Sequence, residues 1–550
     1  MHAFFFMLHP TYMARKARFH KEAVLLGIVC ALVILLLLPR QRAFPRPPTK
    51  ASKNGPPHPV QLLHQQAIRD FEELLSQQSQ SPDEAAAEYE ERYGKPPPPG
   101  FKEWVKYALR QHSPIIDDFD TIFENVEPFH QYSPERLKNL MEKATAGDNA
   151  AATLCSYTKA DGFQDCAYFA DVMEWIFGDA KKRLPDIKVP VNTLDEPSVL
   201  LMNDANDDMA SEWPNLAHQN IVDKVAEACM VRGQTTVDRL LTNKVETFGL
   251  PFVQSVEEEK DLCLHPEYKE YHGFLNTPTS FRQLGTAVPL LSRAAPYPFS
   301  DILMPSPHYA FPHNLYNRIL DTPWHKKKNA VFWHGSTTGG HWHKDTSWRH
   351  GHRQRLAILA NMHAKGQNYT YLQPANDTGQ ASDPWHTYTT PNLDRKLYNV
   401  HISAALQCDD DECEQQTRFF RIDEHSDQPP TQPYRYRFAF DIDGNSYSGR
   451  FHKALAGHTT PLKMSIFREW HDERLIPWLH YVPVSQSMDE LPELMRFLAT
   501  TDEGQEVAFR IAEEGRKWYH RALTPVHQGL YLYRLFLELA WLLDLERPVE

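Results

Sequence analysis

Glycine is scarce in this chain, and positive charge is scarce in most of it. Only 23 of the 550 residues are glycine, against 42 proline, which excludes collagen-like and glycine-rich architectures. The formal net charge is −13, and because the first 54 residues hold nine basic side chains and one acid, the other 496 residues carry −21. So acidic a body lacks the basic surface with which nucleic-acid binders displace counterions, and we expect no nucleic-acid partner. Its 41% hydrophobic and 12% aromatic residues predict two or three folded domains rather than disorder.

The chain has one strong uncharged apolar run, from Ala23 to Leu38. As a helix these residues would span roughly 24 Å, with basic residues on both sides. A cleaved signal peptide would end in an Ala-x-Ala-like site, and the sequence Pro39-Arg40-Gln41-Arg42 offers none. We therefore expect a cytosolic tail over 1–22 and an uncleaved transmembrane signal anchor over 23–39. The protein would then be single-pass and type II, with its body in the lumen.

The cysteines and the glycosylation sequons agree with a secretory location. One cysteine, Cys30, lies in the apolar run, and the other six are Cys155, Cys166, Cys229, Cys263, Cys408 and Cys413. An even number predicts disulfides, with 15 pairings open, and six buried free thiols are the alternative. Two acceptor sequons begin at Asn368 and Asn376. We expect a protein of the Golgi (or ER) membrane.

The rest of the chain alternates between helix-like and strand-like segments. Residues 40–60 are basic and rich in proline, as in an extended stalk. A helical stretch from Gln61 to Arg92 ends before a run of prolines, and Gln528–Leu545 has the apolar spacing of a buried helix. The expected strands include Ser198–Met202, Ala330–Trp333, Asn368–Leu372 and Arg435–Phe440. This alternation favours an α/β fold with mainly parallel sheets.

A loop rich in glycine, serine and threonine, Gly335–Gly340, follows one of these strands. A helix candidate, Trp348–Ala360, comes next and contains Arg353. In a strand–loop–helix unit of this kind, backbone N–H groups and the helix N-terminus can bind a phosphate. The loop matches neither the P-loop nor the G-x-G-x-x-G pattern, so a tight structural turn explains it equally well.

A second polar loop, Asp441–Arg450, separates a strand candidate from the helix candidate Phe451–Leu455. The guanidinium of Arg450 would stand at the start of that helix, where it can bind a diphosphate. Asp441 and Asp443 could hold a metal-bound nucleotide, but an Asp-Gly turn accounts for them as well.

Two adjacent carboxylates, Asp195 and Glu196, follow the apolar stretch Ile187–Val191. A carboxylate at the end of a strand can act as a general base. A helix N-cap with an acid in the first turn is the alternative, and the pattern alone favours it.

Five of the 28 histidines crowd together between positions 334 and 352: His334, His341, His343, His350 and His352. A His-x-His pair can reach one metal from a strand, but the cluster lacks the H-E-x-x-H spacing and an evident third ligand. We expect histidines that bind substrate hydroxyls or are solvated, and no metal site.

Taken in order, these motifs resemble glycosyltransferase family 90, the capsule-associated and protein O-glucosyltransferase-like group, which includes a fungal β-1,2-xylosyltransferase. The resemblance runs from about Arg92 to Trp541. Its pieces are Arg92–Pro97 with Trp104, Leu184–Asp186, Asn192 with Asp195–Pro197, His265–Tyr268, His272-Gly273, Pro298–Leu303, Trp333–Gly340, His352–Leu356, Asp443-Gly444, Ser448, Arg450, Lys463, Glu469-Trp470, Leu475–Trp478 and His480–Pro483.

The resemblance implies a GT-B-like fold, with two Rossmann-like lobes that face a cleft behind the anchor. It places a stalk and helical opening segment over 40–110, an N-terminal acceptor lobe over 111–300 and a C-terminal nucleotide-sugar lobe over 301–550. The family uses UDP-sugars and inverts the anomeric carbon, which needs one general base. The segment that matches the family's base makes Asp195 our first choice for that role.

The donor site implied by the resemblance comprises Ser336, Thr338, Gly339, Arg353, Ser448 and Arg450. Their positive charge and N–H donors would stabilise the departing UDP without a metal, so neither a tightly bound cofactor nor a divalent ion is expected. Two features depart from the family pattern. Gly449 separates Ser448 from Arg450 in a longer loop, and the histidines around position 341 have no counterpart.

The predicted function is therefore that of an inverting glycosyltransferase. It would move a sugar, xylose or glucose, from a UDP-sugar to a glycan or glycoprotein acceptor in the secretory pathway. The first alternative is a catalytically inactive, membrane-tethered relative that binds glycans or serves as a scaffold. The second is a metallohydrolase built on the histidine cluster.

Overall fold

The computed structural model describes residues 55–147, 150–166, 170–203, 205–232, 244–311, 314–361, 367–375, 383–422 and 432–547. The chain divides into two units, Met1–Gly55 and Pro56–Glu550, and the elements below belong to the second. The expected tail, the expected anchor, most of the stalk and the sequon at Asn376 lie outside the described residues. Within the described ranges, no helix combines the length and the apolar character needed to cross a bilayer.

A five-stranded parallel sheet forms the core of the C-terminal half. Its strands are β6 (Lys328–Ser336), β9 (Tyr398–Ala404), β10 (Tyr436–Ile442), β11 (Thr460–Met464) and β12 (Val482–Pro483). They lie in the order β9-β6-β10-β11-β12, and every neighbouring pair is parallel. Counted along the chain, this is the 2-1-3-4-5 order of a doubly wound α/β sheet, in which the winding reverses between the first and third strands. Here those strands are β6 and β10.

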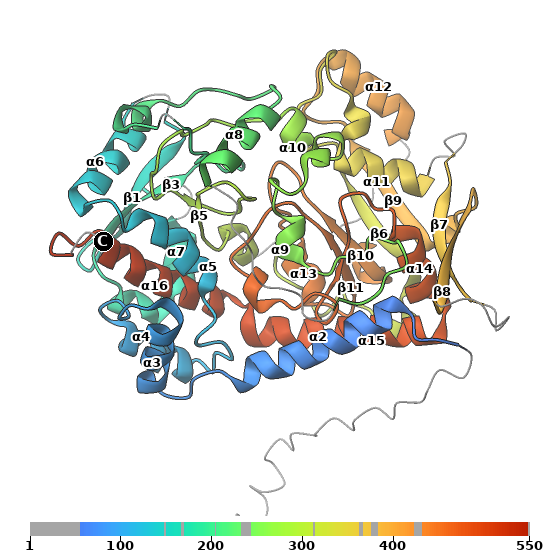
Figure 1. Ribbon diagram of the computed structural model, residues 1–550, viewed down its shortest axis with the longest axis horizontal. Helices are drawn as coiled ribbons and strands as arrows, with labels where there is room; N and C mark the ends of the chain where they lie inside the picture. Colours follow the sequence, from blue (N-terminus) through green and yellow to red (C-terminus); the bar gives the residue numbers. More distant parts are fainter. Residues whose placement is uncertain are drawn as a thin grey trace, which may run out of the picture. The chain divides into compact units, whose positions relative to one another are not determined.

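Helices pack around this sheet because its central strands are apolar on both faces. The helices of this half are α11 (His352–Asn361), α12 (Asp410–Phe420), α13 (Phe451–Leu455), α14 (Leu491–Thr500) and α15 (Asp502–Ala522). The first described helix, α2 (Pro59–Ser76), joins them: it lies along α15, and Val60, Leu63 and Ala67 are buried in the same core (Figure 1). A capping box at His58 and Gln61 starts this helix.

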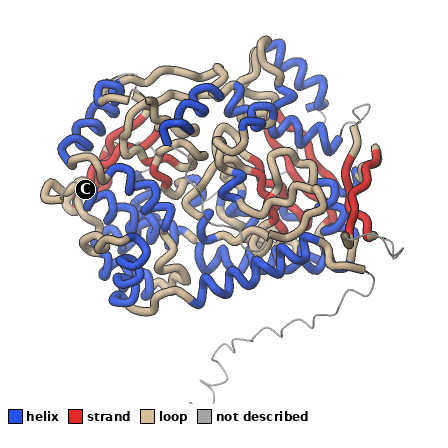
Figure 2. The backbone as a smooth tube through the Cα atoms, in the orientation of Figure 1, coloured by secondary structure: helices blue, strands red, loops and turns tan. Residues whose placement is uncertain are grey.

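The N-terminal half is built on a second, mixed sheet. Its strands are β1 (Ala152–Thr158), β2 (Gly162–Gln164), β3 (Ile187–Asn192), β4 (Leu291–Ser292) and β5 (Ile302–Leu303), in the order β2-β1-β3-β4-β5. Strand β1 is antiparallel to both of its neighbours, whereas β3, β4 and β5 are parallel. The predicted α/β class is confirmed, and Figure 2 shows the two groups of strands. The sheets were expected to be mainly parallel; the C-terminal sheet is parallel throughout, whereas the N-terminal sheet is mixed.

The last helix of the chain returns to this N-terminal core. Around the mixed sheet lie α3 (Pro82–Tyr93), α4 (Phe101–Arg110), α5 (Asp120–Val126), α6 (Pro134–Thr145), α7 (Ala170–Phe177), α8 (Val222–Arg232), α9 (Val256–Glu259) and α10 (Gly273–Asn276). Helix α16 (Pro525–Leu542) packs against α4, α5 and α7 (Figure 1). The Trp104 indole donates a hydrogen bond to the Leu530 carbonyl at 2.9 Å. The buried helix predicted over 528–545 is confirmed.

Two predicted elements differ from the structure. The stretch 61–92 is two helices, α2 and α3, because Ser81 caps a new helix whose first residue, Pro82, cannot continue the previous one. Ser198–Met202 is no strand; it is extended and makes a single bridge between Val199 and Leu284. The other three strands are confirmed as β6, β10 and β7 (Tyr369–Pro374), which pairs with β8 (Trp385–Thr390) in an antiparallel hairpin.

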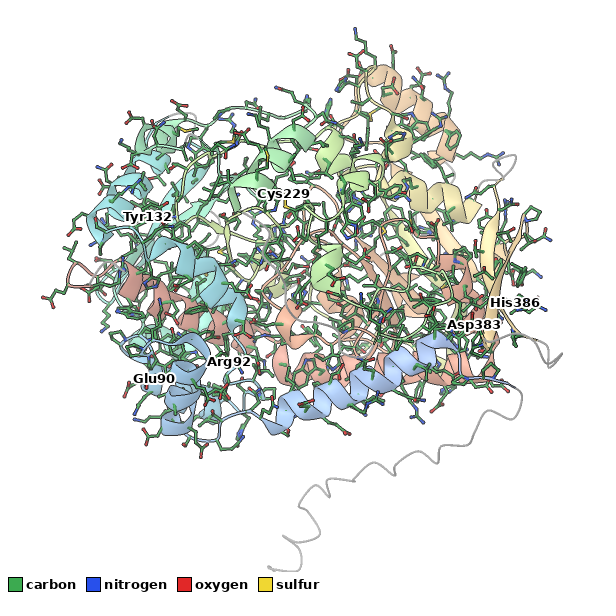
Figure 3. All side chains as sticks on the ribbon, in the orientation of Figure 1. Glu90, Arg92, Tyr132, Cys229, Asp383 and His386 are labelled. Carbon is green, nitrogen blue, oxygen red and sulfur yellow. A yellow bond between two sulfur atoms is a disulfide. The ribbon has the colours of Figure 1, made fainter. Side chains whose placement is uncertain are left out.

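All six cysteines outside the apolar run form disulfides. The pairs are Cys155–Cys166, Cys229–Cys263 and Cys408–Cys413. Figure 3 shows sulfur atoms beside the Cys229 label. The prediction of disulfides is confirmed, and the alternative of six free thiols is wrong.

Candidate active site

Polar loops follow β6 and β10, the two strands between which the parallel sheet reverses its winding. Ligands of doubly wound sheets bind outside the carboxyl ends of the strands at such a point. The structure brings the sequence-predicted donor residues to this edge. They are Ser336, Thr338 and Gly339 after β6, Arg353 on α11, and Ser448 and Arg450 after β10.

Arg353 joins the two loops. Its side chain is buried, its Nη1 donates to Thr338 Oγ1 at 2.6 Å, and its Nε donates to the Asp443 carbonyl at 2.6 Å. Burial lowers the pKa of Arg353 to about 9, and the neighbouring charge of Arg450 adds to the shift. The guanidinium is still charged at neutral pH, so this residue supplies a fixed positive charge at the edge of the sheet.

Arg450 places a second guanidinium close to the first. Its Nη1 donates to the His334 carbonyl at 2.7 Å, and its side chain is exposed. The guanidinium carbons of Arg353 and Arg450 lie 5.8 and 5.9 Å from the centroid of the same ring, that of Trp333. Two like charges so close together repel each other, and an anion bound between them relieves that repulsion. The arrangement suits a phosphate or diphosphate.

The glycines of the first loop are required by close packing. Gly339 has φ +112°, and a Cβ on it would lie 2.4 Å from His352 Cε1 and 2.9 Å from the Gly444 carbonyl oxygen. A Cβ on Gly335 would lie 2.7 Å from the Trp333 ring. The tight-turn interpretation of this loop therefore holds, and it is compatible with anion binding because both require a close approach of the backbone.

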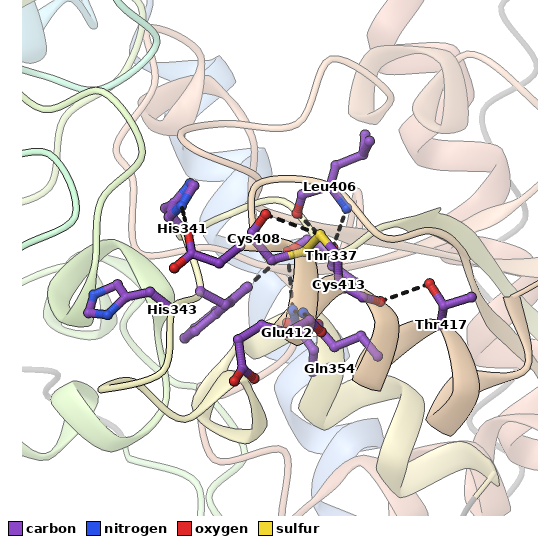
Figure 4. The surroundings of a disulfide bond; sticks show 12 residues. Thr337, His341, His343, Gln354, Leu406, Cys408, Glu412, Cys413 and Thr417 are labelled. Atoms are coloured by element: carbon purple, nitrogen blue, oxygen red, sulfur yellow. Dashed lines mark hydrogen bonds and ion pairs between the residues drawn. A yellow bond between two sulfur atoms is a disulfide. The ribbon is translucent and has the colours of Figure 1, made fainter.

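A disulfide braces the same loop from behind (Figure 4). Thr337 Oγ1 donates to the Leu406 carbonyl and accepts from the Leu406 N–H, both at 2.8 Å. Gln354 Nε2 donates to the Thr337 carbonyl at 3.1 Å. Leu406 lies two residues before Cys408, whose disulfide to Cys413 closes the turn between β9 and α12. The loop after β6 is thus held in place by hydrogen bonds to a turn that a disulfide cross-links to α12.

Buried charges lie under the second loop. Lys463 Nζ contacts Glu469 Oε1 at 3.1 Å and Asp441 Oδ2 at 3.3 Å, and Tyr309 donates to Glu469 Oε2 at 2.5 Å. Burial opposes the charged form of Lys463, but Glu469 and Asp441 outweigh it and raise the pKa of that ammonium. Asp443 Oδ2 accepts the Ile466 N–H at 2.9 Å. Both aspartates of the Asp-x-Asp triplet therefore have protein partners.

Asp195 leaves the N-terminal sheet just after β3. Asn192 shapes the turn: its Oδ1 accepts the Leu194 N–H at 2.8 Å, and its Nδ2 donates to the Glu196 carbonyl at 2.9 Å. Glu196 is buried and accepts the Thr279 and Ser280 N–H groups, each at 3.0 Å. The Asp195 side chain is 51% exposed, and no helix begins at it, so the N-cap interpretation is wrong.

Thr279 connects the turn of Asp195 and Glu196 to the C-terminal loops. Its N–H donates to Glu196 Oε1 at 3.0 Å, and its hydroxyl donates to Asn445 Oδ1, in the loop after β10, at 3.1 Å. Asn445 Oδ1 also accepts the Gly339 N–H at 3.2 Å, and in the same loop the Tyr447 hydroxyl contacts His308 Nδ1 at 3.0 Å. The turn that carries Asp195 therefore adjoins the loop that carries Ser448 and Arg450.

The histidine cluster is dispersed in the fold. His341 Nε2 contacts Asp409 at 3.2 Å, His350 contacts Glu270 at 3.2 Å, and His352 Nε2 contacts the Asp443 carbonyl at 2.9 Å. Across the part of the chain that the structure describes, no group of three or more His, Cys, Asp or Glu side chains could hold a metal ion.

Sequence reasoning assigned no role to Arg293, Tyr309 or Tyr447. Tyr447 lies inside a predicted loop, where an uncharged side chain gives no signal of anion binding. Arg293 follows a strand of only two residues, β4, which gives almost no periodic signal.

The comparisons with known proteins agree with the family resemblance. Residues 310–550 match the family model of glycosyl transferase family 90, which confirms the family-level prediction for that part of the chain. Among curated proteins, the chain is 30% identical over 103 residues to protein O-glucosyltransferase 3 of Rattus norvegicus, a match that covers 18% of this chain and 20% of the relative. It is 32% identical over 93 residues to protein O-glucosyltransferase 1 of Homo sapiens, covering 16% and 22%. These matches thus span about a fifth of each relative's length.

Proposed function

From the glycosyl transferase family 90 domain over residues 310–550, we propose that the protein is an inverting glycosyltransferase. It would move a sugar, xylose or glucose, from a UDP-sugar to a hydroxyl of a glycan or glycoprotein. The observation that carries this proposal is the contact that Thr279 makes between the two parts of the site. It joins the turn of the half-exposed Asp195 to the loop after β10, which carries Arg450.

In the proposed reaction, Asp195 accepts the proton of the acceptor hydroxyl. The acceptor oxygen forms its bond to the anomeric carbon on the face opposite the diphosphate. The bond from that carbon to the diphosphate oxygen breaks, and its electron pair leaves with UDP. Arg353, Arg450 and the loop around Ser336, Thr338 and Gly339 stabilise the charge that develops on the diphosphate, together with Ser448. The proposal assigns this stabilisation to protein groups and requires no divalent metal.

The proposed location is the Golgi or ER membrane, with the body in the lumen. Three disulfides are typical of an oxidising compartment. Asn368, which begins a sequon, is exposed. The proposed type II single-pass anchor rests on the apolar run at 23–38. The proposed division is an acceptor lobe over 111–300 and a nucleotide-sugar lobe over 301–550, facing each other as in the GT-B fold.

The test uses the full-length protein, purified in detergent, with a panel of UDP-sugars and a measurement of UDP release with and without glycan acceptors. We expect turnover with UDP-xylose or UDP-glucose. Asp195→Asn should lower the rate about 10²- to 10⁴-fold and leave UDP affinity unchanged, because a general base contributes that much. Asp208→Asn is the matched control, since Asp208 pairs with Lys143 on the surface of the same half. An unchanged rate in Asp195→Asn would place the base elsewhere.

The same panel separates the alternative function. A protein that binds UDP but releases none from any donor would instead fit the inactive, glycan-binding or scaffold relative. No turnover and no UDP-dependent thermal shift would overturn the proposal.

A further inference from the structure

Arg293 is a buried arginine that contacts the proposed base directly. Its Nη1 donates to Asp195 Oδ1 at 2.8 Å, and its side chain is 3% exposed, against 51% for that of Asp195. Arg293 directly follows β4, and β3 and β4 are parallel with Val191 opposite Leu291. The segments that leave these strands therefore emerge at the same edge of the sheet, which explains how two residues almost 100 positions apart meet.

The ends of the two strands are cross-linked by buried polar side chains. Asn192 Nδ2 donates to Ser292 Oγ at 3.0 Å, and Ser292 Oγ donates to Asp301 Oδ1 at 2.6 Å. Asp301 also accepts the N–H groups of Ser198 and Val199, at 2.9 and 2.8 Å. Burial raises the pKa of Asp301 to about 6. This network fixes the backbone on both sides of the Arg293–Asp195 contact, so the pair is preset rather than a chance encounter of surface charges.

We propose, on the basis of the proposed function, that Arg293 is a positioning residue for Asp195. It holds Oδ1 and leaves Oδ2 as the atom that takes the proton of the acceptor hydroxyl. A planar guanidinium fixed by burial does this better than a mobile ammonium, because it restricts the direction of the contact as well as its charge.

The experiment compares Arg293→Met, Arg293→Lys and wild type in the full-length protein, with the most active donor found in the panel. It measures kcat from pH 5 to 9, the Kd for UDP and the thermal midpoint. Arg293→Met should lower kcat about 100-fold at neutral pH, because the base loses its orientation. UDP affinity should stay within about twofold, because the arginines proposed to bind UDP lie on the other sheet.

Arg534→Met is the matched control. Arg534 is equally buried and contacts Glu538 at 2.6 Å on α16. This variant should lose stability, as Arg293→Met does, but keep the wild-type kcat. In Arg293→Lys the charge remains but the planar contact is lost, so kcat should still fall at least tenfold.

A wild-type kcat in Arg293→Met would overturn the positioning role. If Arg293→Met does not fold, the lysine variant decides, and a wild-type kcat there overturns the role. Failure of the underlying function looks different, since wild-type protein that releases no UDP from any donor removes the proposed function and the positioning role with it.

Discussion

The loop after β6 can pack against its neighbours because residue 339 is glycine and has no Cβ atom. The residue has a positive φ, and its backbone approaches both His352 on α11 and Gly444 in the loop after β10. A side chain there would push the loop after β6 away from α11, which carries Arg353, and from the loop after β10, which carries Arg450. This position therefore links local backbone geometry to the anion site.

We predict that Gly339→Ala destabilises the protein by about 3 kcal/mol, through positive φ and steric overlap together. UDP affinity should fall at least tenfold. Chemical denaturation and calorimetric titration with UDP would measure the two effects. Gly449→Ala is the control for stability, because a Cβ at Gly449 meets nothing within 4 Å, and its cost should stay within about 0.5 kcal/mol. Equal stability of the two alanine variants would contradict the close packing described for Gly339.

Asp195 and Glu196 show what single residues reveal and conceal in a sequence. The two are adjacent and chemically alike, yet Glu196 is buried under three hydrogen bonds from Thr279 and Ser280, whereas Asp195 is half exposed against Arg293. The partners of both come from about 80 to 100 residues away. Residue type and spacing named both as candidates, and only the tertiary contacts separate their roles.

Among the elements, the turn between β9 and α12 has the clearest connection to the site. The Cys408–Cys413 disulfide links this turn to α12. Within the turn, Leu406 accepts a hydrogen bond from the Thr337 hydroxyl with its carbonyl and donates one to that hydroxyl with its N–H (Figure 4). Trp342 adds a second link, since its N–H donates to the Gln407 carbonyl at 2.9 Å and its carbonyl accepts the Asp409 N–H at 2.9 Å. Loosening this turn should therefore change the conformation of the loop after β6.

We predict that Cys408→Ser/Cys413→Ser loses about 2 kcal/mol of stability, as expected for a short disulfide loop. UDP affinity should also fall about fivefold or more, because the brace behind Thr337 relaxes. The matched control is Cys155→Ser/Cys166→Ser, which opens a disulfide joining β1 to the segment after β2 in the other half. It should lose similar stability and bind UDP as wild type does. Thermal melts and calorimetric titration distinguish the two, and equal UDP affinity in both double variants would contradict the coupling.

The elements that could be predicted are those with a long apolar pattern or with clear turn residues at their ends. Strand β6 contains the apolar run Ala330–Trp333, and β10 is largely apolar from Tyr436 to Phe440. The helix predicted at Phe451–Leu455 is α13 with the same bounds. The residues proposed to bind the sugar donor lie between these elements, so they could be named from the sequence. The other half of the site depends on β4 and β5, which have two residues each and no readable alternation. Arg293 follows β4, and so its role was not foreseen.

At the scale of the whole molecule, the chain crosses between its two cores at both ends. Helix α2 packs in the C-terminal core, and α16 packs in the N-terminal one (Figure 1). A boundary at residue 300 thus separates each core from a helix that completes it. Tyr531, Leu535 and Leu539 of α16 are fully buried, and this helix contacts α4, α5 and α7 of the N-terminal half.

We predict that a fragment of residues 301–550 does not fold on its own, although it contains the whole family match. The buried face of α16 would be exposed, and the core would lack α2, so the fragment should elute from size exclusion as aggregate. Co-expression with residues 1–300 should restore soluble material that contains both pieces. The intact chain with the same tag is the control. A soluble 301–550 fragment with a cooperative melt would contradict this account.

The same crossing bears on how this chain could exchange parts with a relative. A hybrid that joins the first half of one relative to the second half of another at residue 300 would give each core one foreign helix. Sequence changes in the groove that receives α2 must be matched near the start of the chain, and changes around α16 must be matched near its end. In a working hybrid, the start of the chain must therefore match the C-terminal core, and the end of the chain must match the N-terminal core. A workable chimera would exchange residues 59–76 together with the parallel sheet and keep 525–542 with the mixed one.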